Sequence, residues 1–415
     1  MKSEERYREL LADLRRAYLN AREHKARTGS CIRCSIDIEE ELDTLARTII
    51  DGSYTIRPSV CFLVKSPVLR EIIAAEFRDR IVHHYVFNYL NPHLERELIT
   101  DCYSCRLKKG TSYGVDRLEH HIRSCSQNYT RECWVLQLDI SGYFMSIDRK
   151  RLCRMALALM DRIGSKRDRK GRLLSSYARH GFVRQLLPTI IMHDPLTDCD
   201  IRDWKGLYSQ LPRSKSLRYS APDCGLPIGN LTSQMFSNLY MNGFDQWVKR
   251  VLKVRHYGRY VDDSYYLSTD REWLLGLVPQ IDDYLQRELG IRLNRKKTKI
   301  MEVKQGVAFL GTYIKPYRRY MRSDTLQRIR QQIDAMKGIP YRKLRRASTR
   351  ERLLASANSF LGVMSHTASF NIALRLFSHY PMFRIADATR GMMKFRLSNE
   401  KVSAIRRRRN KRVNI

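Results

Sequence analysis

The chain contains Gly258-Arg259-Tyr260-Val261-Asp262-Asp263-Ser264-Tyr265-Tyr266-Leu267, where two adjacent carboxylates stand between two β-prone runs. These runs are Val251 to Tyr257 and Tyr265 to Ser268, and they predict a hairpin that carries the acids at its tip. Adjacent like charges repel each other unless a cation lies beside them. A divalent metal is the simplest reason to place Asp262 and Asp263 together.

A second acid, Asp139, follows Leu138 near the end of the alternating segment Gln137 to Ile140, which is typical of a strand. Three carboxylates from two strands can hold two Mg²⁺ ions about 4 Å apart, as in polymerase and nuclease sites. An Asp-Asp pair alone is more often a surface turn. The strands on either side of it and the distant Asp139 favour the metal interpretation.

The run between the two acid sets is Gly225-Leu226-Pro227-Ile228-Gly229-Asn230-Leu231-Thr232-Ser233-Gln234. With the acids, it resembles the reverse transcriptases of prokaryotic retroelements. Most of these enzymes have Gln before this glycine and Ser-Pro at the end of the run. Ile228 and the Ser233-Gln234 pair instead resemble the diversity-generating branch, and we expect the α+β right-hand polymerase fold of that family.

The resemblance runs in order over about residues 55 to 320 and implies a role for each matched position. Asp139, Asp262 and Asp263 would be catalytic, and with Ile140 they would hold two Mg²⁺ ions, or Mn²⁺ instead. The residues that would bind the incoming nucleotide are Lys65, Arg70, Phe144, Ile228, Gly229, Gln234 and Lys297. Those that would bind template or primer are Arg78, Arg80, Arg106, Lys108, Lys109, Tyr260, Phe309, Leu310 and Gly311.

Two of these positions bear on substrate choice. An aromatic ring at Phe144 would leave no room for a ribose 2′-hydroxyl, which predicts a preference for deoxynucleotides. Phe144 could equally be a core residue beside Tyr143. Ile228 offers no hydrogen bond near the templating base, and the resemblance implies error-prone synthesis opposite template adenines. Ile228 could equally be an apolar contact of the glycine-rich turn.

The charge of the chain fits a nucleic-acid partner. Lys and Arg number 77 against 43 Asp and Glu, a net charge of +34 in 415 residues. A polyanion is the natural partner, although any single Lys or Arg could be a solvated surface charge. No apolar run of about 18 residues predicts a membrane span, and no signal core follows Met1. We therefore expect a cytoplasmic protein of a bacterium, archaeon or phage, with no membrane.

The ten cysteines include two Cys-x-x-Cys pairs, Cys31 with Cys34 and Cys102 with Cys105. Together the pairs could form a four-cysteine zinc site. About 67 residues separate them, which is too long for a compact zinc ribbon, and the second pair falls inside a motif of the resemblance. We expect reduced thiols, as in other cytosolic proteins.

The pattern of apolar residues predicts three regions. Residues 1–130 form N-terminal helices and fingers, residues 131–321 form a palm with an insertion at about 164–223, and residues 322–415 form a helical thumb with a basic tail. Helices are expected at Glu4 to Arg22, Ile38 to Asp51, Arg149 to Arg162, Thr232 to Leu252 and Trp273 to Leu289, and the segment Val68 to Leu98 is expected to be mostly helical. A loop is expected at Gly164 to Arg172, an irregular segment at Asp198 to Asp223, and a hairpin at Val307 to Met321.

Three functions follow from these features. The first is a diversity-generating reverse transcriptase that copies a template RNA into adenine-mutated cDNA. The second is a retron, group II intron-like or phage-defence reverse transcriptase. The third is an inactive RNA-binding scaffold, which the intact acids Asp139, Asp262 and Asp263 disfavour. The resemblance implies template RNA, the RNA/cDNA duplex and deoxynucleotides as partners, with a small basic ring-forming accessory protein.

Overall fold

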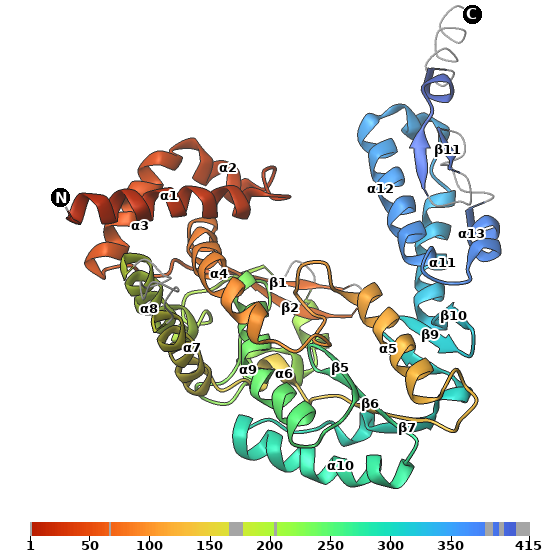
Figure 1. Ribbon diagram of the computed structural model, residues 1–415. Helices are drawn as coiled ribbons and strands as arrows, with labels where there is room; N and C mark the ends of the chain where they lie inside the picture. Colours follow the sequence, from red (N-terminus) through yellow and green to blue (C-terminus); the bar gives the residue numbers. More distant parts are fainter. Residues whose placement is uncertain are drawn as a thin grey trace, which may run out of the picture. The chain divides into compact units, whose positions relative to one another are not determined.

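The computed structural model describes residues 2–65, 68–165, 177–202, 206–377, 385–389 and 394–403 (Figure 1). The chain divides into two compact units. The first comprises Met1–Gly110, Leu136–Leu267 and Glu272–Lys299, and the second comprises Thr111–Val135, Ser268–Arg271 and Ile300–Ile415. Both units combine helices with small, mostly antiparallel sheets, which confirms the predicted α+β class.

The first unit begins with helices α1 (Lys2–Arg22), α2 (Gly29–Ile36) and α3 (Ile38–Asp51). Helix α1 packs on α3 and on α4 (Phe77–Glu97) through an apolar stripe at helical spacing, in which Leu10, Leu14 and Ala17 are buried. Gly52 ends α3 in the left-handed conformation with φ 82°, as a C-terminal glycine commonly does. The predicted helix from Ile38 to Asp51 is confirmed.

The first unit also contains a three-stranded sheet with the strand order β2-β1-β4. Its strands are β1 (Val60–Val64), β2 (Arg70–Ala74) and β4 (Asp200–Arg202), and β4 runs parallel to β1. The segment from Val68 to Leu98, predicted to be mostly helical, begins with β2 and continues as helix α4. Its β-branched Ile72 and Ile73 pair with β1, a partner that lies before the segment and that its own sequence does not identify.

The central sheet has the order β5-β6-β3-β7. Its strands are β3 (Trp134–Leu138), β5 (His256–Tyr260), β6 (Asp263–Ser268) and β7 (Lys299–Glu302). The helices of this part of the chain are α6 (Tyr143–Ser146), α7 (Arg149–Gly164), α8 (Tyr177–Met192), α9 (Leu231–Arg250) and α10 (Arg271–Tyr284).

The predicted acid-bearing hairpin is confirmed, because β5 and β6 pair antiparallel around a two-residue turn. Its first strand begins later than predicted, at His256, because Val251 caps the C-terminal end of α9. The predicted loop at 164–172 falls largely outside the described residues. The segment 198–223, predicted to be irregular, contains β4 and three short 3₁₀ turns at 207–210, 213–215 and 217–219.

The second unit contains α5 (Thr111–Cys125), the sheet β10-β9-β8 and helices α11 (Ser323–Lys337), α12 (Ala347–Met364) and α13 (Phe370–Phe377). The sheet strands are β8 (Val307–Phe309), β9 (Thr312–Lys315) and β10 (Arg318–Met321), so the predicted hairpin gains a third strand. The helices enclose a core that includes Ile333, Leu353 and Phe377.

The helices expected after Asp324 are present, and a short hairpin of β11 (Ala386–Ala388) and β12 (Phe395–Leu397) was not predicted. The basic tail at 406–412 lies outside the described residues. The boundaries of fingers, palm and thumb remain a prediction. Among the helices described, none has the length and apolar character needed to cross a membrane.

Candidate active site

The three predicted acids meet in the first unit. Asp139 follows β3 directly and is buried, while Asp262 occupies the β5–β6 turn and Asp263 begins β6. The order of the sheet places β3 next to β6, which brings acids 124 residues apart in sequence to the same edge. The geometry therefore unites the two acid sets, as the sequence predicted.

The electrostatics of these acids show that they repel one another. Burial and then repulsion from Asp139 raise the pKa of Asp262 above its ordinary value. The same causes, together with repulsion from Asp262, raise the pKa of Asp263 to about 7. Fully ionised carboxylates are therefore costly here without a cation beside them.

Two side chains from the segment after α10 contact Asp139. Lys297 Nζ lies 2.9 Å from Asp139 Oδ1, and Asn294 Nδ2 donates to Asp139 Oδ2 at 3.1 Å. The hydrogen bond to Asp139 raises the pKa of Lys297, so its ammonium stays charged. Asn294 was not among the predicted site residues, although it stands three positions before the predicted Lys297.

The donor set suits a hard divalent cation, since Mg²⁺ and Mn²⁺ prefer carboxylate oxygens and the three acids need positive charge between them. In the part of the chain that the structure describes, no three His, Cys, Asp or Glu side chains are already arranged as a metal-binding set. Asp139 is directed toward Asn294 and Lys297 in this arrangement. Metal binding by Asp139, Ile140, Asp262 and Asp263 thus remains a prediction.

The raised pKa of Asp263 predicts how metal affinity depends on pH. A metal binds the ionised carboxylate, so below about pH 7 protons compete with it. We expect the half-saturating Mg²⁺ concentration for DNA synthesis to rise up to about tenfold per pH unit as the pH falls below 7. A titration at pH 6, 7 and 8 would measure this. A midpoint that does not change over this range would contradict the shifted pKa.

The same shift has a consequence for stability. Because the folded pKa of Asp263 lies above its unfolded value, ionisation weakens the metal-free fold as the pH rises from about 4 to 7. Asp263→Asn should therefore raise the melting temperature at pH 8 and leave it nearly unchanged near pH 4. The Asp263 side chain is crowded by its neighbours but still reaches water, which screens part of the repulsion, so a gain of about 1–3 °C is expected.

Arg70, on the β1–β2 hairpin, acts on the acids through its charge. Lys65 and Arg70 are exposed at the hairpin's end, where Val64 pairs with Arg70. The positive charge of Arg70 lowers the pKa of Asp262, as does that of Lys297, although burial and Asp139 outweigh both. This placement suits the predicted contact of Arg70 with a triphosphate.

The Ile-Gly element lies against β2 through its backbone. Ile73 N donates to the Ile228 carbonyl at 2.8 Å, and a Cβ at Gly229 would lie 2.9 Å from Ile73 O. Gly229 also has φ 139°, so both its conformation and its contact require glycine. Gln234 is exposed in the first turn of α9, whose N-cap is Asn230.

Phe144 and Ile228 share one apolar cluster. Both are partly exposed and pack against Cys61, Met145 and Leu217. The neighbouring Tyr143 is the buried residue of the pair, and its hydroxyl donates to Ser237 O at 2.7 Å. The ring of Phe144 thus packs on this cluster and is still partly exposed, and its contact with a sugar stays a prediction.

Phe144→Ala tests this role. Removing the ring should let ribonucleotides enter, and we expect the deoxy-over-ribo ratio of kcat/KM to fall about 10²-fold. Single-nucleotide incorporation on a primed RNA would measure the ratio. Tyr143→Phe is the matched control, because it removes only the buried hydroxyl and should leave sugar choice unchanged. Strict rejection of ribonucleotides by Phe144→Ala would favour a packing role.

Three of the arginines predicted to bind template or primer make contacts within the protein. Arg78 is buried, with its guanidinium 3.1 Å from Glu41, and Arg80 Nε donates to Ala75 O at 2.9 Å. Arg106 bonds Glu95 at 2.8 Å, while its Nη1 donates to the Ile99 carbonyl at 2.7 Å. These contacts favour a structural role for all three arginines.

The other residues predicted to bind template or primer lie in different parts of the fold. Lys108 is exposed at φ 60°, and Lys109 Nζ donates to Thr100 O at 2.6 Å. Tyr260 lies next to the acid turn, at the end of β5. Phe309, Leu310 and Gly311 belong to the second unit, where Leu310 and Gly311 form a two-residue turn with φ 46° and 83°.

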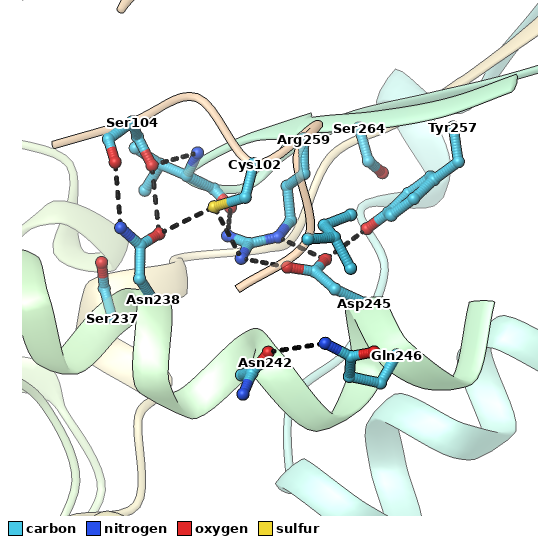
Figure 2. A network of polar contacts seen from close by, with 12 residues as sticks. Cys102, Ser104, Ser237, Asn238, Asn242, Asp245, Gln246, Tyr257, Arg259 and Ser264 are labelled. Atoms are coloured by element: carbon cyan, nitrogen blue, oxygen red, sulfur yellow. Dashed lines mark hydrogen bonds and ion pairs between the residues drawn. The ribbon is translucent and has the colours of Figure 1, made fainter. Parts of the chain in front are cut away.

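A buried polar network, which the sequence motifs did not predict, joins helix α9 to strand β5 next to the acid turn (Figure 2). Arg259 and Asp245 are both fully buried and form an ion pair with Nη2–Oδ2 at 2.6 Å and Nε–Oδ1 at 2.8 Å. The Tyr257 hydroxyl donates to Asp245 Oδ1 at 2.6 Å. Burial lowers the pKa of Arg259, but the Asp245 carboxylate raises it well above its usual value. A lone Asp within a predicted helix gave no signal for this pair.

The ten cysteines are free, and Cys31 and Cys102 are buried. Cys102 Sγ lies 3.4 Å from both Asn238 Oδ1 and Arg259 Nη2. Cys102, the first cysteine of the second pair, thus belongs to the buried polar network around Arg259, which gives it a packing role.

Comparison with known proteins decides the class of this site. Residues 173–314 match the family described as reverse transcriptase (RNA-dependent DNA polymerase). The match includes the Ile-Gly element, Asp262, Asp263 and Lys297, and it begins after Asp139. The chain carries a reverse transcriptase domain. The predicted enzyme class, RNA-directed DNA polymerase, is confirmed, and the right-hand fold predicted from the sequence agrees with it.

The reverse transcriptase domain has a distant curated relative. Protein YkfC of Escherichia coli (strain K12) is 24% identical over 305 residues, which cover 65% of this chain and 70% of that protein. Among solved structures, an apo telomerase from Candida tropicalis, truncated from its C-terminal domain, has a TM-score of 0.47 at 12% identity, over 65% of this chain and 56% of that one.

A second telomerase structure is similar to the same degree. The Candida albicans telomerase with a TWJ fragment of telomeric RNA has a TM-score of 0.47 at 11% identity, over 78% of this chain and 54% of that one. The chain therefore spans a little over half the length of these telomerases. None of these likenesses distinguishes one branch of reverse transcriptases from another.

Proposed function

We propose that the protein copies a retroelement template RNA into cDNA with frequent errors opposite adenine, and so diversifies a target gene. The observation that carries this proposal is the environment of Ile228. Its carbonyl is fixed to β2, and its side chain packs on the apolar cluster that also holds Phe144. No polar side-chain atom at this position can test the geometry of a base pair.

The chain's own residues suggest how synthesis proceeds. Asp139, Asp262 and Asp263 concentrate negative charge at one sheet edge, while Lys65, Arg70 and Lys297 offer charges for a triphosphate. Two divalent ions, when bound, would activate the primer hydroxyl and screen the leaving pyrophosphate. Lys297 keeps its proton beside Asp139, so it can stabilise negative charge on the departing group.

Template RNA, its cDNA duplex and deoxynucleotides are the proposed ligands, and the net charge of +34 supports a polyanionic partner. A small basic accessory protein is proposed from the family resemblance alone. The cytoplasm of a bacterium, an archaeon or a phage-infected cell is the proposed location.

The alternative is a retron, group II intron-like or phage-defence reverse transcriptase. These would share the acids, the triphosphate contacts and the basic surface. They differ in the expected error spectrum, since only the diversity-generating enzyme concentrates errors at template adenines. Fidelity therefore separates the two proposals.

The test compares wild-type protein with Ile228→Gln. Full-length protein is given a primed RNA, Mg²⁺ and all four deoxynucleotides, and the cDNA is sequenced. We expect errors concentrated opposite adenine in the wild type, and a reduction of about tenfold in Ile228→Gln, since one well-placed hydrogen bond is worth about 1 kcal/mol or more.

Ile201→Gln provides the matched control, because Ile201 is an exposed isoleucine on β4 and lies outside the apolar cluster. Its error spectrum should equal that of the wild type. Evenly accurate cDNA from the wild type would favour the alternative reverse transcriptases. An unchanged spectrum in Ile228→Gln would remove Ile228 from the mechanism.

A further inference from the structure

The turn that carries the acids has an unfavourable backbone conformation. Val261 stands between Tyr260 and Asp262 with φ 57°, which L-residues rarely adopt and which is least favourable for β-branched ones. In two-residue hairpins, a positive φ at this first position is usually supplied by glycine. A conformation of this kind persists only where its surroundings hold it.

Both backbone groups of Val261 are held by side chains. Val261 N donates to Ser104 Oγ at 3.2 Å, and Arg259 Nη1 donates to the Val261 carbonyl at 2.8 Å. Ser104 lies in the segment between α4 and α5, whereas Arg259 lies on β5. The turn is therefore fixed from two sides, by residues 157 and two positions away in sequence.

Helix α9 in turn holds these two side chains (Figure 2). The Ser104 hydroxyl donates to Asn238 Oδ1 at 3.2 Å, and Asn238 Nδ2 donates back to Ser104 O at 2.9 Å. About two turns further along α9, Asp245 pairs with Arg259 at 2.6 Å. Ser104 and Asn238 are at most 2% exposed, so these hydrogen bonds form away from water, where leaving one unmade is costly.

We propose that Ser104 and Arg259, fixed by Asn238 and Asp245 of α9, are positioning residues for metal binding. They hold Val261 in its left-handed conformation, and thereby set the direction of the Asp262 and Asp263 carboxylates that follow it. None of the four touches the reacting atoms. Their effect is on how well the carboxylates are arranged for a divalent cation before it binds.

Ser104→Ala is the informative variant, because it removes one hydroxyl and leaves both charges of the ion pair intact. With full-length protein, saturating primed RNA and deoxynucleotides, the Mg²⁺ concentration for half-maximal synthesis should rise about tenfold, as for other groups that orient metal ligands. The maximal rate should largely recover at high Mg²⁺. Affinity for primed RNA should stay within about twofold of the wild-type value.

Ser237→Ala is the matched control. Ser237 is equally buried on α9, but its hydroxyl donates to Gln234 O in its own helix and does not touch Val261. Its Mg²⁺ midpoint should equal that of the wild type. Direct titration with Mn²⁺, followed by electron paramagnetic resonance without nucleotides, should give the same order of affinities as the activity assay.

Ser104→Cys covers the case in which Ser104→Ala does not fold, because it keeps a side chain of similar size while weakening both hydrogen bonds. Its midpoint should lie between those of Ser104→Ala and the wild type. An unchanged midpoint in a folded Ser104 variant would overturn the proposal. So would an equal shift in Ser237→Ala, or a loss of maximal rate that high Mg²⁺ does not restore.

Discussion

Asp262→Asn should lower the rate of DNA synthesis by roughly 10³-fold or more, while affinity for primed RNA stays within about twofold. The substitution keeps the shape of the side chain and removes the charge that a divalent cation needs. The basic surface is unchanged, so binding of the polyanion should persist. Primer extension and a filter-binding titration on the same preparation would measure both quantities.

Asp270→Asn is a suitable control for this experiment, since Asp270 is an exposed acid just beyond β6. Its rate should match that of the wild type. Full activity of Asp262→Asn would refute the metal role of the hairpin acids. Loss of RNA affinity in parallel with activity would indicate misfolding, and a melting curve would show it.

Asp245→Asn should destabilise the protein by about 3–5 kcal/mol, because it leaves the fully buried Arg259 without a compensating charge. The carboxylate accepts hydrogen bonds from Arg259 Nε, Arg259 Nη2 and the Tyr257 hydroxyl, and an amide cannot accept all three. Urea unfolding followed by circular dichroism would measure the change in the free energy of unfolding.

Asp161→Asn removes one partner of an exposed ion pair, in which Arg184 and Asp161 side chains are 42% and 64% exposed. It should cost about 0–1 kcal/mol. Comparing Asp245→Asn with Asp161→Asn shows how far the loss of stability depends on the burial of the ion pair, because both variants remove one negative charge. A loss below about 1 kcal/mol for Asp245→Asn would mean that the Arg259 guanidinium finds another partner or reaches water.

The positions of the three acids on strands and a hairpin could be predicted from the sequence. Adjacent Asp262 and Asp263 between β-prone runs predicted the hairpin, and the alternating residues around Asp139 predicted that this acid lies at the end of a strand. These features follow from local patterns, namely two-residue periodicity and turn composition. The strand boundary at residue 251 was wrong because Val251 caps helix α9, and the strand begins only at His256.

Long-range partners could not be predicted. Arg78 and Arg106 look like nucleic-acid contacts in sequence, but Glu41 and Glu95 neutralise them in the fold. The sequence does not show whether an arginine faces solvent or a buried carboxylate, so only the tertiary structure separates the two roles. Likewise, no local pattern links Ser104 to Val261, because 157 residues separate them.

The strand order β5-β6-β3-β7 has a consequence for any attempt to isolate the catalytic domain. The segment that matches known reverse transcriptases begins at residue 173, and thus omits β3, which lies between β6 and β7. A fragment cut at that boundary would lack the middle of its sheet and expose two unpaired strand edges, which favour aggregation. It would also lack Asp139, so the smallest autonomous enzyme must begin well upstream of the part that sequence comparison identifies.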